Sequence, residues 1–185
     1  FEGTPSPVKN PEYVDMVIDT FGEEIADKML EIPDLKSEGA YTAVGTYDYQ
    51  EMLALVTNLS EQTGIAVNDL VKTFGKHLTK VFASRYAVFF ENVKDPFDFL
   101  ESIDDHIHKE VLKLHPNALL PSFSSRREGE DQLILEYRSS RPFGVLAHGL
   151  IEGSLGHFDC AATIDVEDLS EPGRSHVIFT VSKTT

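Results

Sequence analysis

The histidines between Asp95 and Pro121 are the residues of this chain that most suggest coordination chemistry. Apolar residues recur there at steps of three and four, which predicts one amphipathic helix that begins at Pro96. At about 100° per residue, His106 and His108 lie on opposite edges of the apolar stripe, so their imidazoles diverge by about 200°. This divergence disfavours a two-histidine zinc site. One histidine is enough for a haem iron. This helix alone favours the simpler interpretation that His106, His108 and His115 are ordinary surface or boundary residues.

A second candidate group follows on a predicted strand. Two alternating runs, Ser122–Arg127 and Gln132–Ser139, flank a short acidic turn and predict a β-hairpin. If the second strand stays extended as far as Arg141, then Tyr137, Ser139 and Arg141 share one face over about 13 Å. Such a row could hold two carboxylates at the edge of a flat ligand, because arginine meets a carboxylate through paired hydrogen bonds. The same row could also be the end of a strand that reaches solvent.

Two glycine patterns indicate backbone that another body approaches closely. Gly75 lies inside a long helix predicted from Asn68 to Phe89, and Gly149, Gly153 and Gly156 recur along a helix predicted over Phe143–Phe158. A glycine inside a helix costs about 1 kcal/mol relative to alanine, so its presence calls for a packing reason. Either a large flat ligand or a neighbouring helix could supply that reason.

The remaining patterns predict an α+β fold with a helical N-terminal lobe and an antiparallel sheet in the C-terminal lobe. Residues 1–9 are a proline-rich lead-in, and short helices follow Asn10 and cover residues 23–31 and 51–59. Residues 37–47 are typical of a loop with a β-rich centre. Near the C-terminus, residues 162–166 and 177–181 alternate around a Glu-Pro-Gly turn and predict a second hairpin.

Composition limits the partners. The chain of 185 residues has 31 acidic and 16 basic side chains and a formal charge of −15, so its surface should repel nucleic acid and anionic lipid. No apolar run is long enough to span a bilayer.

Cys160 is the only cysteine, which excludes an intramolecular disulfide and a thiolate cluster within one chain. The start of the chain lacks the features of a secretion signal, and we expect a cytoplasmic location.

Three segments together resemble the haem-nitric oxide/oxygen binding (H-NOX) family, which includes the haem domain of soluble guanylate cyclase. They are DDHIHKEVLKLHPNALLPSF, LEYRSSR and GLIEGSLGHF, which occur in this order and near the family's spacing. The resemblance covers about Asp15 to Val181. It implies that residues 1–185 form a single H-NOX domain, which begins with an atypical lead-in of about residues 1–10. Haem would be buried between a helical distal lobe of about 11–92 and a proximal lobe of about 93–185.

The resemblance also implies roles for single residues. His108 matches the axial ligand of ferrous haem b, and His106 is the competing register. The spacing to Pro121, which matches a proline packed against the haem, selects His108. Tyr137, Ser139 and Arg141 match the residues that bind the haem propionates. The residues that match the rest of the haem pocket are Leu78, Phe82, Leu146 and Tyr13.

Leu146 bears on the choice of gas. Family members that hold oxygen stably have a tyrosine at the matching position, which donates a hydrogen bond to the bound ligand. Leucine cannot donate one, so the resemblance implies a sensor of NO, with CO as a further ligand and O₂ disfavoured. Tyr13 matches a position in the distal pocket, and its hydroxyl is the basis of an alternative, an O₂-binding sensor. The first-helix contacts depart from the family pattern, because Pro5, Pro7, Lys9 and Pro11 replace the usual apolar opening.

The implied mechanism is the weakening of the bond between iron and His108 by NO, followed by a shift of one lobe against the other. The sequence contains no Walker loop, nucleophile elbow or kinase signature, so we expect no enzyme activity. The resemblance therefore implies an output through a partner in trans, either a signalling histidine kinase or a cyclic-di-GMP enzyme.

Two further interpretations belong to other classes of protein. An enzyme, such as a haem oxygenase, a peroxidase or a hydrolase that uses His108 with Asp104 and Asp105, would need a distal acid-base group. The residues that match the distal pocket do not provide one. A cofactor-free binding module would keep its spectrum and its function when His108 is replaced by alanine.

Overall fold

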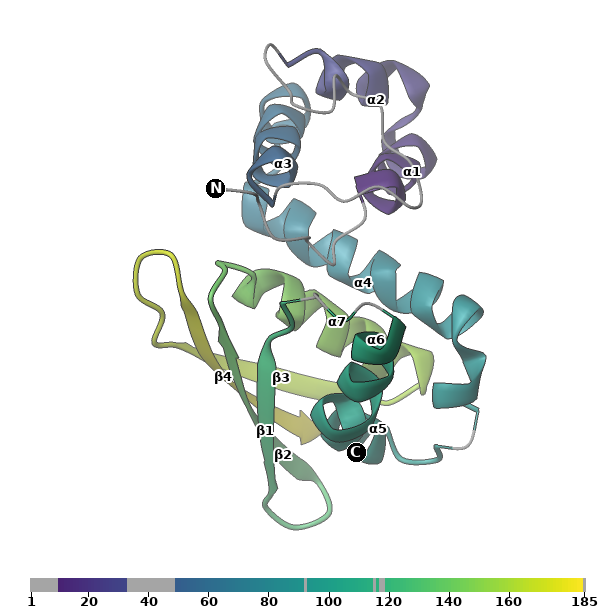
Figure 1. The fold of residues 1–185 in the computed structure, drawn as a ribbon, viewed down its shortest axis with the longest axis vertical. Helices are drawn as coiled ribbons and strands as arrows, with labels where there is room; N and C mark the ends of the chain where they lie inside the picture. The colour runs from purple at the N-terminus through teal and green to yellow at the C-terminus, as the bar shows by residue number, and fades with distance from the viewer. Residues whose placement is uncertain (1–9, 33–48, 92, 115, 117–118, 185) are drawn as a thin grey trace. The chain divides into compact units, whose positions relative to one another are not determined.

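The computed structural model describes residues 10–32, 49–91, 93–114, 116 and 119–184 (Figure 1). The chain divides into two compact units, one of which ends at Phe74 while the other begins at Gly75. The division falls inside helix α4, Val67–Arg85. Residues 1–9 and 37–47, for which the sequence predicts a lead-in and a loop, lie outside the described residues, as does His115.

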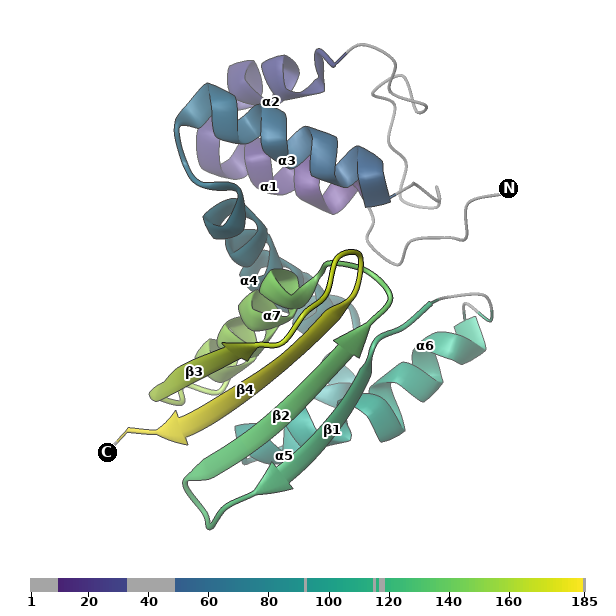
Figure 2. The same ribbon diagram turned by 90° about the vertical axis from the view of Figure 1, so that its left-hand side faces the viewer.

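Helices build the first unit, as predicted. Helix α1, Asn10–Phe21, is followed by α2, Glu23–Leu30, and α3, Tyr49–Thr63. Helix α2 packs against both α1 and α3 (Figure 2). Gly22 separates α1 from α2 at φ 88°, a backbone conformation that glycine adopts without steric cost. The buried side chains of this unit are those of the apolar faces expected from the sequence, among them Met16, Val17, Met29, Met52, Leu55 and Leu59.

A four-stranded antiparallel sheet organises the second unit. Its strands are β1, Ser122–Arg127, β2, Gln132–Ser139, β3, Ala162–Asp168, and β4, Ser175–Lys183. Their order in the sheet is β1-β2-β4-β3 (Figure 2). Both predicted hairpins are therefore confirmed, and the pairing of β2 with β4 joins them into one sheet.

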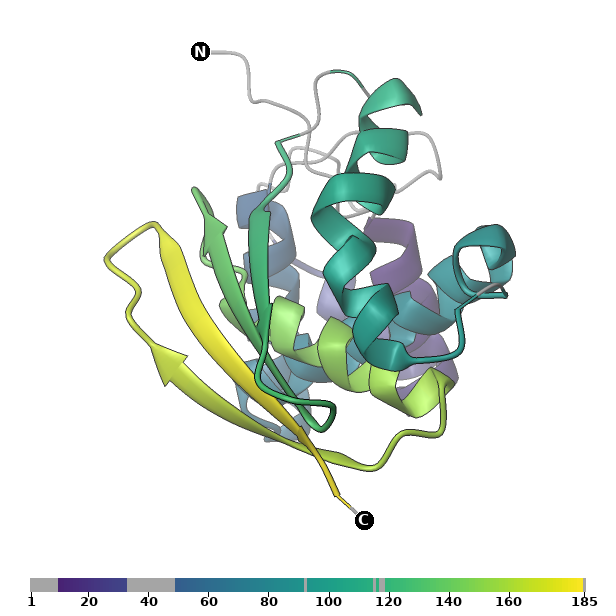
Figure 3. The ribbon, with the colours of Figure 1, turned by 90° about the horizontal axis from the view of Figure 1, so that it is seen from below.

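One face of the sheet is covered by helices. Figure 3 shows α7, Gly144–His157, and the helix that contains α5, Pro96–Ser102, on the same face. Alternate residues of β2 and β4 point into this layer and are at most 3% exposed: Leu133, Leu135, Tyr137, Val177, Phe179 and Val181. Each such side chain stabilises the fold by about 1.5–3 kcal/mol on burial. The alternation that predicted the strands is thus the pattern of the core.

The predicted histidine helix is irregular. Asp95 caps α5, because its carboxylate accepts a hydrogen bond from the Phe97 N–H at 3.0 Å. A π-helical turn, η2, Ile103–Ile107, then precedes α6, His108–Leu114. The prediction of one regular helix was wrong at this turn, and the angles calculated at 100° per residue do not hold across it. Side chains that bond outside the helix ladder commonly accompany such irregularities, and Asp104 in this turn does so.

Helix α4 differs from its prediction at both ends. It begins at Val67, so Asn68 lies in its first turn rather than at the cap, and it ends at Arg85. Phe89 belongs to a separate 3₁₀ turn, η1, Ala87–Phe89. Among the described helices, none is both long and apolar enough to cross a membrane.

The contact between α4 and α7 explains Gly75, Gly149 and Gly153 of the glycine patterns, but not Gly156. A Cβ added to Gly75 would lie 2.6 Å from the carbonyl oxygen of Leu146, and one added to Gly153 would lie 2.6 Å from the Thr79 hydroxyl. That hydroxyl lies within hydrogen-bond distance of the carbonyl oxygens of Gly75, at 3.3 Å, and Leu150, at 3.2 Å. Glycine therefore lets the two helix backbones approach closely, which is the neighbouring-helix interpretation.

Replacing Gly75 by alanine should destabilise the protein, although alanine is the better helix former. The new Cβ would meet backbone atoms of α7, including Cα of Gly149 at 2.8 Å, and backbone cannot move aside cheaply. We expect Gly75→Ala to lower the free energy of unfolding by about 1–3 kcal/mol, measured by urea denaturation.

Gly156→Ala is the matched control on α7, because a Cβ there meets nothing within 4 Å. It should leave stability unchanged or raise it by up to about 1 kcal/mol. Equal stability of the Gly75→Ala variant and the wild type would contradict the close packing.

Candidate functional site

His108 is held in one orientation by a carboxylate. It lies where the π-helical turn meets α6, its side chain is 16% exposed, and its Nδ1 lies 3.1 Å from Oδ1 of Asp104. Because a carboxylate accepts, Nδ1 carries the hydrogen and the lone pair of Nε2 remains for a metal. The same Asp104 oxygen accepts a hydrogen bond from the backbone N–H of Phe123 in β1, at 3.2 Å. The imidazole is therefore oriented from the sheet as well as from its own helix.

Aromatic rings connect His108 to the second candidate group. The Phe123 ring lies 6.0 Å from the His108 ring and 5.1 Å from the Tyr137 ring, between centroids. Tyr137 on β2 is 3% exposed. Burial raises the pKa of Tyr137, and a hydrogen bond with Ser139 offsets part of this rise, so the hydroxyl stays protonated at neutral pH. These ring contacts therefore run from the histidine helix through β1 to β2.

The chain does not stay extended as far as Arg141, so the condition for a straight row from Tyr137 to Arg141 is not met. Strand β2 ends at Ser139, whose hydroxyl accepts a hydrogen bond from the backbone N–H of Arg141 at 3.1 Å. The Phe143 N–H in turn donates to the Arg141 carbonyl at 2.9 Å. The bond between the Ser139 hydroxyl and the Arg141 N–H turns the chain toward α7 instead of letting it stay extended. Arg141, at 8% exposure, is nearly buried in the bend, and Ser139 contacts both other members of the group.

Three apolar residues that the resemblance assigns to the haem pocket lie on α4 and α7. Leu78 and Leu146 are each 6% exposed, whereas Phe82 is 40% exposed. The glycine contact described above places the backbone of Leu146 against α4 at Gly75. None of these three side chains can donate a hydrogen bond. Pro121 is half-buried immediately before β1.

Tyr13 belongs to the first unit. It is fully buried, with its ring 5.0 Å from the Phe74 ring in an edge-to-face arrangement. Burial raises its pKa far above the usual value. Its hydroxyl has no hydrogen-bond partner among the described residues, and a buried donor in that state is costly. Tyr13 therefore has a buried hydroxyl whose hydrogen-bonding capacity no described residue satisfies.

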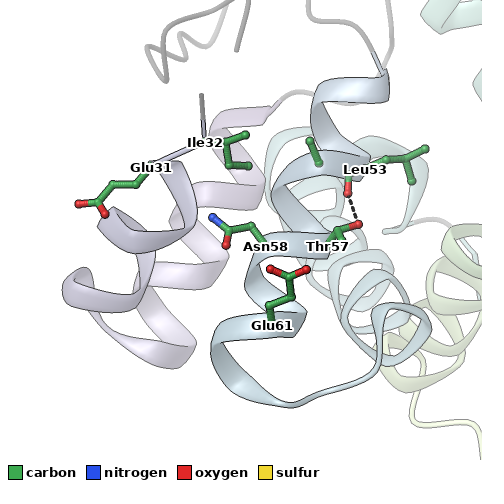
Figure 4. Close-up of a pocket in the computed structure, with 7 residues that line it drawn as sticks. Glu31, Ile32, Leu53, Thr57, Asn58 and Glu61 are labelled. Carbon is green, nitrogen blue, oxygen red and sulfur yellow. Dashed lines mark hydrogen bonds between the residues drawn. The ribbon is translucent and has the colours of Figure 1, made fainter. Parts of the chain in front are cut away.

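A separate cleft of about 480 Å³ lies in the first unit (Figure 4). Its lining includes Glu31, Ile32 and Glu61, together with Thr57, whose hydroxyl donates to the Leu53 carbonyl at 2.7 Å. The Asn58 amide in its wall donates to the carbonyls at the end of α2. None of the site residues expected from the sequence lines this cleft, and its Thr57 and Asn58 side chains bond to backbone carbonyls of α3 and α2.

Two residues that support His108, Asp104 and Phe123, could not be assigned this role from the sequence. The sequence suggests Asp104 only as a possible partner in hydrolysis, although an aspartate four residues before a histidine can reach it on a helix. Phe123 was not singled out, because its contact with Asp104 joins residues that lie 19 apart in sequence.

Comparisons with known proteins show the family and the fold of this chain. The model of the Haem-NO-binding family matches residues 10–166. A point mutant of an H-NOX protein from K. algicida, solved in the Fe(II) unliganded state, is 38% identical over 96% of this chain and 97% of that chain, with a TM-score of 0.88. The H-NOX from Shewanella woodyi, solved in the Fe(II)CO state with IWP-051 bound, is 39% identical over 95% and 92%, with a TM-score of 0.79.

A point mutant of the T. tengcongensis H-NOX, at 23% identity, 95% coverage of each chain and a TM-score of 0.80, shows the same fold. A comparison with curated proteins found no match. The chain belongs to the Haem-NO-binding family of H-NOX domains. This is a family of haem-based gas sensors rather than enzymes.

Replacing Asp104 should loosen the support of His108. Asp104→Ala removes the oxygen that accepts hydrogen bonds from the Phe123 N–H and from the imidazole. Because the Asp104 side chain is 44% exposed, water would replace part of this lost hydrogen bonding. We expect the free energy of unfolding of the haem-free protein to fall by about 1 kcal/mol, measured by urea denaturation.

Asp105→Ala is the matched control, because Asp105 is 89% exposed and pairs with Lys109 on the surface. It should change stability by less than about 0.5 kcal/mol. Equal effects of the two substitutions would show that the Asp104 contacts do not hold this part of the structure.

Proposed function

We propose that this protein senses NO with a ferrous haem b whose iron is bound by Nε2 of His108. The observation that carries the proposal is the contact between Asp104 and Nδ1 of His108, because it selects the tautomer that an axial ligand requires. His106 is the weaker candidate for the ligand. It is exposed, and its ring lies against Phe89 at 5.7 Å.

The second group of residues fits the acidic edge of a haem. Tyr137 and Ser139 offer hydroxyls, and Arg141 offers a guanidinium in the bend that follows β2. Propionates are carboxylates, which such donors bind through charge-assisted hydrogen bonds. Pro121, Leu78, Phe82 and Leu146 would contact the apolar porphyrin.

The apolar lining supports NO rather than O₂. Bound O₂ carries partial negative charge and gains stability from a hydrogen-bond donor, whereas the side chains of Leu78, Phe82 and Leu146 offer none. NO binds ferrous iron without such a donor. The S. woodyi H-NOX was solved with CO on Fe(II), which supports CO as a further ligand of this chain.

The signal would start at His108. NO bound to the iron would weaken the bond to the His108 imidazole, so that His108 and its helix would be free to move and the two lobes would shift. A change of coordination at one side chain then has a global effect. We propose that the output is read in trans by a signalling histidine kinase or a cyclic-di-GMP enzyme in the cytoplasm.

An anaerobic absorption spectrum of the reduced, reconstituted protein tests this function. NO should shift the Soret band to the position that marks loss of the histidine ligand. His108→Gly should weaken haem retention at least about tenfold, because one coordinate bond is lost, and added imidazole should restore the spectrum.

His106→Gly is the matched control, two residues away and exposed, and it should behave as the wild type. If His106→Gly needs imidazole and His108→Gly does not, the ligand has been assigned to the wrong register. If the protein takes up no haem, the proposed function fails.

The alternative function is O₂ sensing with Tyr13 as the donor, and the specific observation in its favour is the buried hydroxyl without a partner among the described residues. Our account expects the reduced protein to keep its spectrum in air, and Tyr13→Phe to leave that behaviour unchanged. Tyr86→Phe, on a tyrosine that is 38% exposed, is the control. A stable change of spectrum in air that Tyr13→Phe abolishes and Tyr86→Phe does not would favour O₂ sensing.

A further inference from the structure

One arginine of the sheet binds three carboxylates of the histidine helix. At the end of β1, Arg127 places Nε 2.8 Å from Glu101, Nη1 3.2 Å from Asp95 and Nη2 2.5 Å from Asp98. All three carboxylates lie on α5 or on its cap. A guanidinium with every nitrogen engaged holds its partners in a fixed geometry, which a single surface ion pair does not.

A second cation of the sheet completes this anchor. Lys183 at the end of β4 lies 3.2 Å from Asp95, and its ammonium is 4.4 Å from the centre of the Phe97 ring, on which Arg127 also lies. Partial burial alone would raise the pKa of Asp95, but the Phe97 N–H, Lys183 and Arg127 together lower it. The Asp95 carboxylate therefore stays ionised at neutral pH.

The two halves of the histidine helix differ in how they are held. In α5, Pro96, Phe97, Phe99 and Leu100 are all buried. In α6 beyond His108, Lys109, Leu112 and Lys113 are exposed, and Glu110 and Val111 are only half-buried. Burial and the Arg127 contacts thus stop short of α6.

The π-helical turn lies between these halves. His108 closes it, since its backbone N–H donates to the carbonyl of Ile103, five residues earlier. The start of the turn is held to β1 through Asp104 and the Phe123 N–H. A turn of this kind interrupts the regular hydrogen-bond ladder, and its bonds can rearrange without unfolding the helix on either side.

We propose that Arg127 is a positioning residue of the sensor, which fixes α5 to the sheet so that release of His108 bends the helix at the π-helical turn and moves α6. This inference rests on the proposed function, in which NO releases His108. Without the anchor, the same release would loosen the whole helix, and less of the movement would reach the exposed face of α6.

Amide hydrogen exchange measured by mass spectrometry tests this role in the reduced, haem-loaded protein with and without NO. In the wild type, NO should raise exchange at residues 109–113 by about tenfold and leave residues 97–102 within about twofold. In Arg127→Gln the NO-dependent rise should extend to residues 97–102. Glu101→Gln, which weakens the same contact from the helix side, should act in the same direction.

Arg126→Gln is the matched control, because Arg126 is the neighbouring residue and pairs with Glu128 on the surface. It should reproduce the wild-type pattern, and Arg127→Lys should give an intermediate one. A wild type in which NO loosens α5 and α6 equally would overturn the proposal. So would an Arg127→Gln variant whose α5 exchanges faster by the same factor with and without NO, since that is a merely structural effect.

The absorption spectrum, recorded on the same samples, separates this result from failure of the proposed function. If NO leaves the histidine ligand in place, the sensing mechanism fails, and with it the role given to Arg127. If the ligand is lost but exchange in α5 is insensitive to Arg127, the sensing mechanism stands and the anchor is wrong.

Discussion

The hydrogen bonds of Asp104 are the contacts on which the candidate site depends. One carboxylate oxygen accepts from the imidazole of His108 and from the backbone of Phe123. The first contact sets the tautomer, and the second fixes the carboxylate relative to the sheet. Because Phe123 lies against both His108 and Tyr137, the same contact relates the proposed iron ligand to the proposed propionate site. An Asp side chain in a π-helical turn thereby joins two parts of the chain.

The close approach of α4 and α7 at Gly75 positions the apolar residues Leu78 and Leu146 of the candidate site. With Gly75 against the backbone of Leu146, the helices are close enough for Leu78 and Leu146 to be buried in the same unit. A larger residue at position 75 would push the lining apart. If Leu78 and Leu146 line the haem pocket as proposed, this backbone approach would set the space next to the iron, and the two leucines would make it apolar.

Most of the fold could be predicted from the sequence, because local periodicity encodes it. The alternation from Gln132 to Ser139 gave the strand and its buried face, and the glycines and prolines gave most helix ends. The π-helical turn could not be predicted, since one irregular turn leaves the apolar spacing intact. The bend before Arg141 depends on the hydrogen bond that the Ser139 hydroxyl accepts from the Arg141 N–H, which an alternating pattern does not reveal. The roles of His108, Tyr137 and Leu146 came from family resemblance and remain proposals.

The resonance Raman spectrum of the reduced protein tests the central claim most directly, because it contains a band from the iron–histidine bond itself. Our account predicts this band in the wild type and in His106→Gly, its loss in His108→Gly, and its disappearance from the wild type when NO is added. Asp104→Asn should shift the band, because the charge of the acceptor on Nδ1 is removed. A band that survives in His108→Gly without imidazole, or that persists under saturating NO, would contradict the account.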